Sequence, residues 1–350
     1  MHTLRLHIDA NNLGSSAGRA AIEQAASVLR RGGTVAFPTE TVYGLGANAL
    51  DASAVAKIFV AKQRPGWDPL IVHLADRAAL PAITQAVSPN ASRLMDAFWP
   101  GPLTLLLPRS DAVPRTVTAG RPLVGVRIPR HPIAHALLQA AGVPVAAPSA
   151  NLFGRTSPTL AAHVAEDLEG RIDVIIDSGE TTHGLESTVV DPNADPPVVY
   201  RPGVITLDQI CAVCQGAVLY GEKVPSAATG PESLPSPGVG IRHYAPHARL
   251  VLIDTGPDQA MRFAAEVRAA EESGKKTGLM LPEAFEYYDA GSALVYRWGT
   301  WTNEEELAQK LFAGLRWLDA QGATLIVCPL PEAKGIGVAM RDRLQKAARR

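Results

Sequence analysis

The spacing of apolar and polar positions changes repeatedly along the first part of the chain. Apolar runs of about four to eight residues are typical of strands, and an apolar position every three or four residues is typical of helices. Strands are therefore predicted at 3–9, 34–39, 70–74, 103–108, 123–129, 144–150, 174–179 and 187–191, and helices at 17–31, 52–62, 89–98, 132–142 and 159–169. Strands interleaved with helices predict an α/β domain with a twisted mixed sheet.

A second α/β region follows a stretch of different character. Residues 215–247 are rich in Pro, Gly and Ser and have no period, which is typical of a linker or a functional lid. After residue 248, strand-like runs alternate with helical patterns, among them 257–273 and 302–320. We therefore expect a first domain over 1–214, a linker over 215–247 and a smaller, Rossmann-like α/β domain over 248–350.

Composition narrows the classes of function. The chain has 350 residues, 47% of them hydrophobic, and 33 Lys and Arg balance 34 Asp and Glu. Such a chain has a folded core, and it lacks the basic excess of a nucleic-acid-binding surface. No apolar run approaches the ~18 residues that cross a bilayer, and three cysteines make no disulfide framework, so we expect a cytoplasmic protein without membrane contact. Cys211 and Cys214 are expected to be packed thiols, with a redox or zinc role as the lesser alternative.

Nucleotide-binding motifs of the usual kinds are weak or missing. The sequence contains no G-x-x-x-x-G-K-[ST], which excludes a P-loop at the level of motif. YGLGANA at 43–49 resembles a dinucleotide-binding turn only superficially, and glycines that permit a tight turn and close backbone approach are favoured there. Pro246 between His243 and His247 breaks the helix that would align these histidines for a metal.

Polar residues gather where the predicted strands end. Ligands of open α/β sheets bind beyond strand ends, where irregular backbone exposes N–H groups. His73 and Arg127 interrupt apolar strands. For His73 alone a satisfied core histidine is favoured, whereas for Arg127 a structural pair with a buried carboxylate and a functional role are equally compatible with the pattern. Four cations taken together favour a pocket for phosphates and a carboxylate; they are Lys62, Arg64, Arg127 and Arg201.

Eight ordered motifs carry a family resemblance: PTETVYGLGANAL, KQRPGWDPLIVHL, WPGPLTLLL, VGVRIPRHP, APSANLFGRTSPT, GLESTVVD, RPG and SPGVGIRHYAPHA. Together they closely resemble the threonylcarbamoyl-AMP synthase family in its long form, with an N-terminal YrdC-like catalytic domain. The resemblance implies an ATP-dependent nucleotidyltransferase that condenses L-threonine with bicarbonate or CO2, releasing pyrophosphate, with Mg2+ bound through the ATP phosphates. It further implies that a threonylcarbamoyl-transferase complex uses the product to modify tRNA; a weak direct contact with RNA and the role of the C-terminal domain stay open.

The resemblance also assigns residues. The family's Lys-x-Arg and Ser-x-Asn pairs fall on the catalytic positions Lys62, Arg64, Ser149 and Asn151. Its threonine-binding positions fall on Thr41, His73, Arg127, Ser149 and Ser187, and its nucleotide-binding positions on Arg64, Asp68, Asn151, Thr159, Arg201 and the linker tyrosine Tyr244. Two residues depart from the family pattern: Asp68 replaces Asn and adds charge near phosphate, and Phe153 replaces a small polar residue.

Two other interpretations are disfavoured. A module that binds RNA without catalysis conflicts with the balanced charge and with the lack of interleaved aromatic and basic residues. A carbamoyl-transferring enzyme of the same fold carries acylphosphatase and zinc-finger regions that this sequence lacks.

Overall fold

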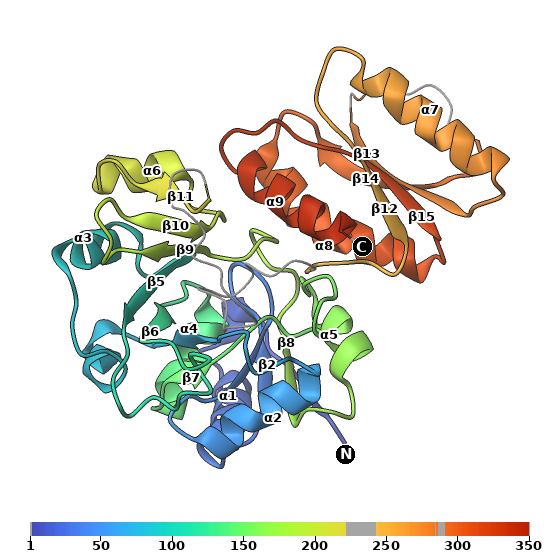
Figure 1. The fold of residues 1–350 in the computed structure, drawn as a ribbon. Coiled ribbons are helices and arrows are strands. Elements are labelled where there is room, and N and C mark those ends of the chain that lie inside the picture. Colours follow the sequence, from blue (N-terminus) through green and yellow to red (C-terminus); the bar gives the residue numbers. More distant parts are fainter. Residues whose placement is uncertain (1, 222–242, 284, 286–290, 350) are drawn as a thin grey trace. The chain divides into compact units, whose positions relative to one another are not determined.

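Two compact units make up the chain. The computed structural model describes residues 2–221, 243–283, 285 and 291–349 (Figure 1). The first unit comprises residues 1–153, 158–182 and 186–240, and the second comprises residues 154–157, 183–185 and 241–350. Two short segments from the middle of the sequence therefore belong to the C-terminal unit.

A mixed sheet is the centre of the first unit. Its strands are β1 (Leu4–His7), β2 (Val35–Phe37), β3 (Gly44–Asn48), β4 (Ile71–His73), β5 (Leu103–Pro108), β6 (Leu123–Arg127), β7 (Val145–Ala146), β8 (Val174–Asp177), β9 (Thr188–Asp191), β10 (Val198–Arg201) and β11 (Val218–Leu219). Over the described residues the order is β1-β8-β2-β3-β7-β4-β6-β5-β9-β10-β11. β1, β8 and β2 are parallel, whereas β3 and β7 run antiparallel to both of their neighbours. The predicted mixed sheet is confirmed.

Helices cover both faces of this sheet: α1 (Ser16–Arg30), α2 (Ala52–Lys62), α3 (Pro89–Phe98), α4 (Pro132–Ala141), α5 (Ala161–Leu168) and α6 (Leu207–Val213). Successive side chains of a strand point to opposite faces. Val35 and Phe37 of β2 accordingly belong to a core cluster with residues of α1 and α4, while Ala36 belongs to the cluster that includes residues of α2, α3, α5 and α6. Asp51 caps α2, because its Oδ1 atom accepts hydrogen bonds from the backbone of Ser53 at 2.8 Å and of Ala54 at 3.2 Å.

The YGLGANA run corrects one expectation. It forms strand β3, paired with β2 and β7, rather than a tight turn. The expected close approach of the backbone is present, since a Cβ atom on Gly46 would lie 2.7 Å from Val145 Cγ1 and 2.8 Å from Phe37 Cε1. Glycine is needed here because neighbouring side chains fill the space beside the strand.

The second unit is a smaller α/β domain, as predicted. Strands β12 (Arg249–Ile253), β15 (Leu325–Pro329), β13 (Thr277–Glu283) and β14 (Leu294–Thr300) form a parallel sheet in that order. Its helices are α7 (Gln259–Glu272), α8 (Glu304–Ala320) and α9 (Gly337–Ala348) (Figure 1). The middle of the predicted linker and lid, residues 222–242, lies outside the described residues.

Two further expectations concern the cysteines and the membrane. Cys211 and Cys214 are free thiols at the end of α6, and Cys214 is buried against the sheet core. The packed-thiol interpretation is therefore confirmed. None of the helices in the described part of the chain is long and apolar enough to cross a membrane.

The crowding at Gly46 predicts a stability effect. Gly46→Ala should lower the unfolding free energy of the first unit by about 1–3 kcal/mol, because the new methyl group must displace Val145 or Phe37. Gly14→Ala is the matched control, since nothing lies within 4 Å of a Cβ atom there. Urea unfolding of both variants measures the difference, and equal stability would contradict the packing argument.

Candidate functional site

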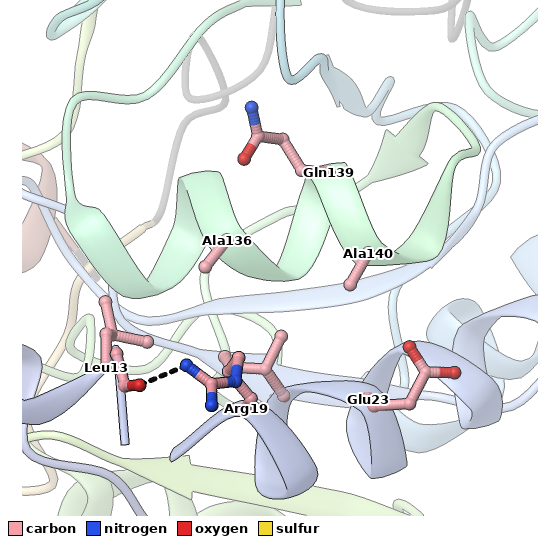
Figure 2. Close-up of a pocket in the computed structure, with 8 residues that line it drawn as sticks. Leu13, Arg19, Glu23, Ala136, Gln139 and Ala140 are labelled. Carbon is pink, nitrogen blue, oxygen red and sulfur yellow. Dashed lines mark hydrogen bonds between the residues drawn. The ribbon is translucent and has the colours of Figure 1, made fainter. Parts of the chain in front are cut away.

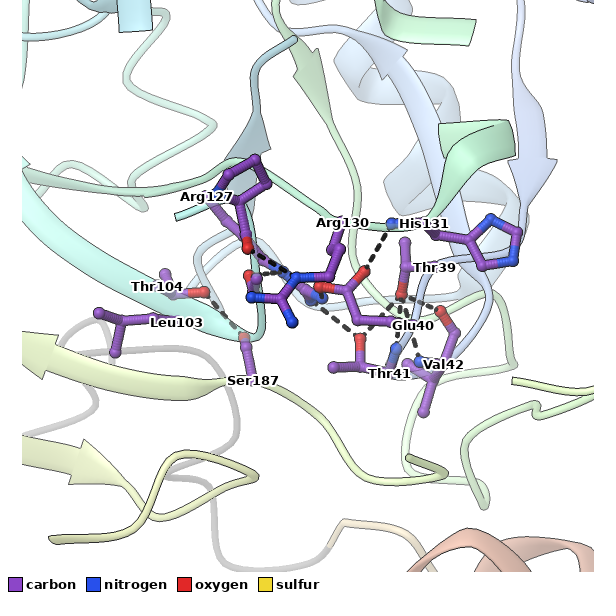
Figure 3. Close-up of polar contacts among 12 residues, drawn as sticks. Thr39, Glu40, Thr41, Val42, Leu103, Thr104, Arg127, Arg130, His131 and Ser187 are labelled. Atoms are coloured by element: carbon purple, nitrogen blue, oxygen red, sulfur yellow. Dashed lines mark hydrogen bonds and ion pairs between the residues drawn. The ribbon is translucent and has the colours of Figure 1, made fainter. Parts of the chain in front are cut away.

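Arg127, the last residue of β6, is buried, and each of its three guanidinium nitrogens contacts a neighbouring oxygen atom. Its Nη2 atom pairs with Glu40 Oε1 at 2.7 Å, Nη1 donates to Thr41 Oγ1 at 2.9 Å, and Nε donates to the carbonyl of Gly101 at 3.2 Å (Figure 3). Burial opposes ionisation of Glu40, but the charge and hydrogen bond of Arg127 lower the pKa of Glu40 to about 2. The structural pairing that the sequence left open thus exists, and Glu40 is the partner.

The loop between β2 and β3 holds Glu40 and Thr41 in place. Thr39 Oγ1 donates to the carbonyl of Val42 at 2.7 Å and lies 2.8 Å from Thr41 Oγ1 (Figure 3). This loop also reaches other predicted site residues through Tyr43, whose carbonyl accepts from Ala150 at 2.8 Å and whose N–H donates to Pro158 at 2.9 Å. Residues 39–43 therefore join Arg127 to the segments that carry Ser149, Asn151 and Thr159.

Ser187 lies beside the same region, at the start of β9. Its hydroxyl is 2.8 Å from Thr104 Oγ1 and accepts from Arg201 Nη2 at 3.1 Å. The Arg201 guanidinium also donates to the Ser187 carbonyl, at 2.9 Å from Nη2 and 3.1 Å from Nε. Thr104 of β5 contacts Ser187, and Gly101, three residues earlier in the chain, contacts Arg127. The contacts of Ser187 and those of Arg127 are therefore linked by one short stretch of chain.

His73 is a neutral, buried neighbour of Arg127. The two residues are register partners in the parallel pair of β4 and β6. Burial and the positive charge of Arg127 lower the pKa of His73 to about 3. At neutral pH this imidazole is therefore uncharged.

Lys62 ends α2 with its ammonium group among backbone oxygens. Its Nζ atom donates to the carbonyl of Ser149 at 2.6 Å and to that of Asn151 at 2.5 Å. Gln63, in the left-handed region at φ 52°, stops the helix there. The lysine thereby joins the predicted Lys-x-Arg and Ser-x-Asn pairs in one cluster.

Arg64 is buried against an acidic partner. Its Nη2 atom lies 3.0 Å from Asp68 Oδ2, and further bonds run to the carbonyls of Asp68 at 3.1 Å and Pro69 at 2.7 Å. The centroid of the Phe153 ring lies 5.9 Å from the guanidinium carbon of Arg64. The Phe153 N–H donates to the Lys62 carbonyl at 2.8 Å. The two departures from the family pattern, Asp68 and Phe153, therefore both contact Arg64.

The first unit brings the predicted residues together, with one exception. Thr159 is buried, with its N–H 3.3 Å from His163 Nδ1, next to the Pro158 carbonyl that binds Tyr43. The exception is Tyr244, which belongs to the second unit. Its ring stacks on that of Phe312, with the two centroids 5.6 Å apart. Sequence reasoning missed Glu40 and Thr104 as site residues. Arg127 in an apolar strand could have indicated a nearby acidic partner such as Glu40, and Thr104 is the single hydroxyl residue in the apolar run LTLLLP.

Other hollows and clusters lie apart from these residues. A cavity of about 590 Å³ between α1 and α4 is lined by Leu13, Gly14, Arg19, Ile22, Glu23, Ala136, Gln139 and Ala140 (Figure 2). It includes none of the predicted site residues. Across residues 2–221, 243–283, 285 and 291–349, no three His, Cys, Asp or Glu side chains gather into a potential metal site.

Comparison with known sequences decides the family. A family model described as "Telomere recombination" matches residues 27–203, and one described as "Threonylcarbamoyl-AMP synthase, C-terminal domain" matches residues 205–349. Threonylcarbamoyl-AMP synthase of Pyrococcus abyssi is 44% identical over 333 residues, which are 93% of this chain and 94% of the relative. The chain belongs to the threonylcarbamoyl-AMP synthase family. It is therefore an enzyme of that family, as the sequence motifs predicted.

Other members of the family extend the match. The Bacillus subtilis threonylcarbamoyl-AMP synthase is 44% identical over 329 residues, covering 93% of this chain and 92% of the relative. The crystal structure of P. abyssi Sua5 complexed with L-threonine superposes with a TM-score of 0.89 at 40% identity, covering 99% of this chain and 98% of that chain. The two-domain architecture is thus that of the long threonylcarbamoyl-AMP synthases.

The low pKa of His73 predicts how stability depends on pH. The unfolded chain binds a proton at His73 below about pH 6.5, while the folded chain does not until about pH 3. Stability from this residue is therefore complete above pH 6.5 and falls by about 1.4 kcal/mol per pH unit below it. His73→Asn should reduce that slope. The effect is measured between pH 6.5 and 4.5, the upper part of the interval between the unfolded and folded pKa values of His73, because Glu40 titrates below that range.

Hydrogen exchange of β4 and β6 amides across this pH range measures the slope for the first unit alone. His135→Asn, on the half-buried part of α4, is the control. A slope that His73→Asn leaves at its wild-type value would contradict the assignment of a buried neutral imidazole.

Proposed function

We propose that this enzyme forms L-threonylcarbamoyl-AMP from L-threonine, bicarbonate or CO2, and ATP, and releases pyrophosphate. The observation that carries the proposal is the connected set of buried residues around the loop 39–43, in a chain that matches threonylcarbamoyl-AMP synthases over nearly its whole length. A relative with 40% identity holds L-threonine. One cluster supplies hydroxyl and guanidinium groups for an amino acid, and the adjoining one supplies cations for phosphates.

Arg127 is the proposed binder of the threonine carboxylate. A guanidinium has five N–H donors, and the contacts with Glu40, Thr41 and Gly101 use three of them. One donor on each terminal nitrogen then remains, the number that a bidentate carboxylate takes up. Thr41, Ser149 and Ser187 supply hydroxyls for the rest of the amino acid, and His73 supports the strand end behind them.

Lys62, Arg64 and Arg201 are the proposed partners of the nucleotide, together with Asn151, Thr159 and Tyr244. Asp68 already balances the charge of Arg64, so in this protein Asp68 orients the guanidinium instead of adding a free negative charge near phosphate. Because Glu40 and Asp68 are both bound by arginines, we assign Mg2+ to the ATP phosphates and to no carboxylate cluster of the chain. When bound, the ion offsets phosphate charge.

The reaction follows from these placements. The neutral threonine amine attacks the carbon of CO2, forms a C–N bond and loses a proton, which gives a carbamate. A carbamate oxygen then attacks the α-phosphorus of ATP, the bond to the bridging oxygen breaks, and pyrophosphate leaves. Lys62 and Arg64 stabilise the charge that develops on the phosphates, so the protein acts as a nucleotidyltransferase. Holding both substrates in one place removes an entropic barrier of roughly 7–11 kcal/mol.

The product's chemistry indicates its use. Threonylcarbamoyl-AMP is a mixed anhydride that water hydrolyses, so a partner must accept it soon after release. We assign that role to a cytoplasmic threonylcarbamoyl-transferase complex that modifies tRNA.

Incubation with ATP, L-threonine and bicarbonate tests the proposal directly. Mass spectrometry should detect threonylcarbamoyl-AMP, and pyrophosphate release should require threonine. Lys62→Ala should slow this release roughly 100- to 1,000-fold, because a buried cation that faces developing charge is lost. Lys57→Ala is the control, since Lys57 lies on the same helix and also donates to a backbone carbonyl, that of Gly32 at 2.7 Å. Near-normal turnover of Lys62→Ala would refute its catalytic role, and no threonine-dependent product from the wild type would refute the function.

A further inference from the structure

The C-terminal unit incorporates segments that adjoin the candidate site in sequence. Residues 154–157 belong to this unit and directly follow Phe153, which binds Lys62 through its backbone. Residues 183–185 also belong to it and lead into Glu186 and Ser187. Both segments therefore lie next to proposed substrate-binding residues in the sequence.

One face of helix α8 contacts these segments on successive turns. Residues four apart on a helix lie on one face. A Cβ atom on Gly184, at φ +66°, would lie 2.4 Å from the Gln309 carbonyl oxygen, so the 183–185 segment lies directly against the helix. Phe312 stacks on Tyr244, and Arg316, one turn further, donates from Nη2 to the Thr156 carbonyl at 2.6 Å.

The segments on this face also bind each other. Ala245 donates its N–H to the Gly154 carbonyl at 2.8 Å, and Arg155 contacts the ring of His247. Tyr244 adopts a left-handed φ of 66°, which a non-glycine residue keeps only when its surroundings hold it. Phe312 on one side and Arg343 of α9, with its guanidinium 5.1 Å from the ring centroid, supply such surroundings.

We infer that the α8 face formed by Phe312 and Arg316 positions Tyr244, the proposed nucleotide-binding residue of the second unit, with Arg316 as its main positioning residue. This rests on the proposed function, because Tyr244 is a nucleotide-binding residue only there. Arg316 is 5% exposed, and it acts through the Thr156 carbonyl, because the same segment accepts a hydrogen bond at Gly154 from Ala245, next to Tyr244. The proposed threonine-binding residues all belong to the first unit, whereas Arg316 and Tyr244 both belong to the second.

Steady-state kinetics of the full-length protein test the inference. Arg316→Met should raise the KM for ATP by roughly 10-fold or more, since displaced binding groups weaken the complex, and should leave the KM for threonine at the wild-type value. Arg316→Lys keeps a charge and a donor, so it should restore part of the ATP affinity. Phe312→Leu should also raise the KM for ATP, because it removes the ring that stacks on Tyr244.

Arg341→Met is the matched control. Arg341 also donates to a backbone carbonyl within the second unit, that of Pro331 at 2.8 Å. Its hydrogen bonds go to Pro331 and Asp254, outside residues 154–157, 183–185 and 244–247. It should leave both KM values unchanged. Melting temperatures of all variants separate a loss of folded protein, which lowers kcat, from a change in KM.

The outcomes are distinguishable. If Arg316→Met does not fold, Arg316→Lys and Phe312→Leu decide by the same KM comparison. Folded variants with a wild-type KM for ATP, or with equal rises for ATP and threonine, would overturn the inference while the proposed function stands. A wild-type protein that makes no threonylcarbamoyl-AMP would overturn both.

Discussion

The buried ion pair of Arg127 and Glu40 constrains the rest of the candidate site. A guanidinium at the end of an apolar strand is costly to bury unless an acidic group and further acceptors surround it. Glu40 supplies the charge, and Thr41 and Gly101 supply the acceptors. Forming this pair fixes the loop between β2 and β3. Tyr43 of that loop and Leu45 of β3 in turn bind the backbone of Pro148, Ala150 and Pro158.

Charge in the site is balanced by the fold itself. Arg127 and Arg64 each have a buried carboxylate partner, while Lys62 and Arg201 are held by backbone carbonyls. Such partners keep the cations in one geometry before any substrate arrives, which is what electrostatic stabilisation of a transition state requires. Asp68 fits this arrangement, since it neutralises Arg64 and orients its guanidinium.

The sequence predicted elements better than it predicted partners. Helices and strands follow local periodicity, so their positions agreed within a few residues. β3 was missed because its glycines resemble a turn, although Phe37 and Val145 require them. Glu40 was missed as a site residue because its pairing with Arg127 spans 87 positions and three antiparallel strand pairings separate β2 from β4. The contacts of Tyr244 with Phe312 and Arg343 likewise join distant parts of the chain.

The central claim is that the Arg127 guanidinium, set by Glu40, binds the carboxylate of the amino acid. Calorimetry with L-threonine and with L-threoninol, which has an alcohol in place of the carboxylate, tests it most directly. Wild-type protein should bind threonine roughly 10- to 100-fold more tightly than threoninol, the value of a charge-assisted pair. Arg127→Lys should reduce this ratio, because a single ammonium cannot replace a two-point contact. Equal affinity of the wild-type protein for the two compounds would contradict the account.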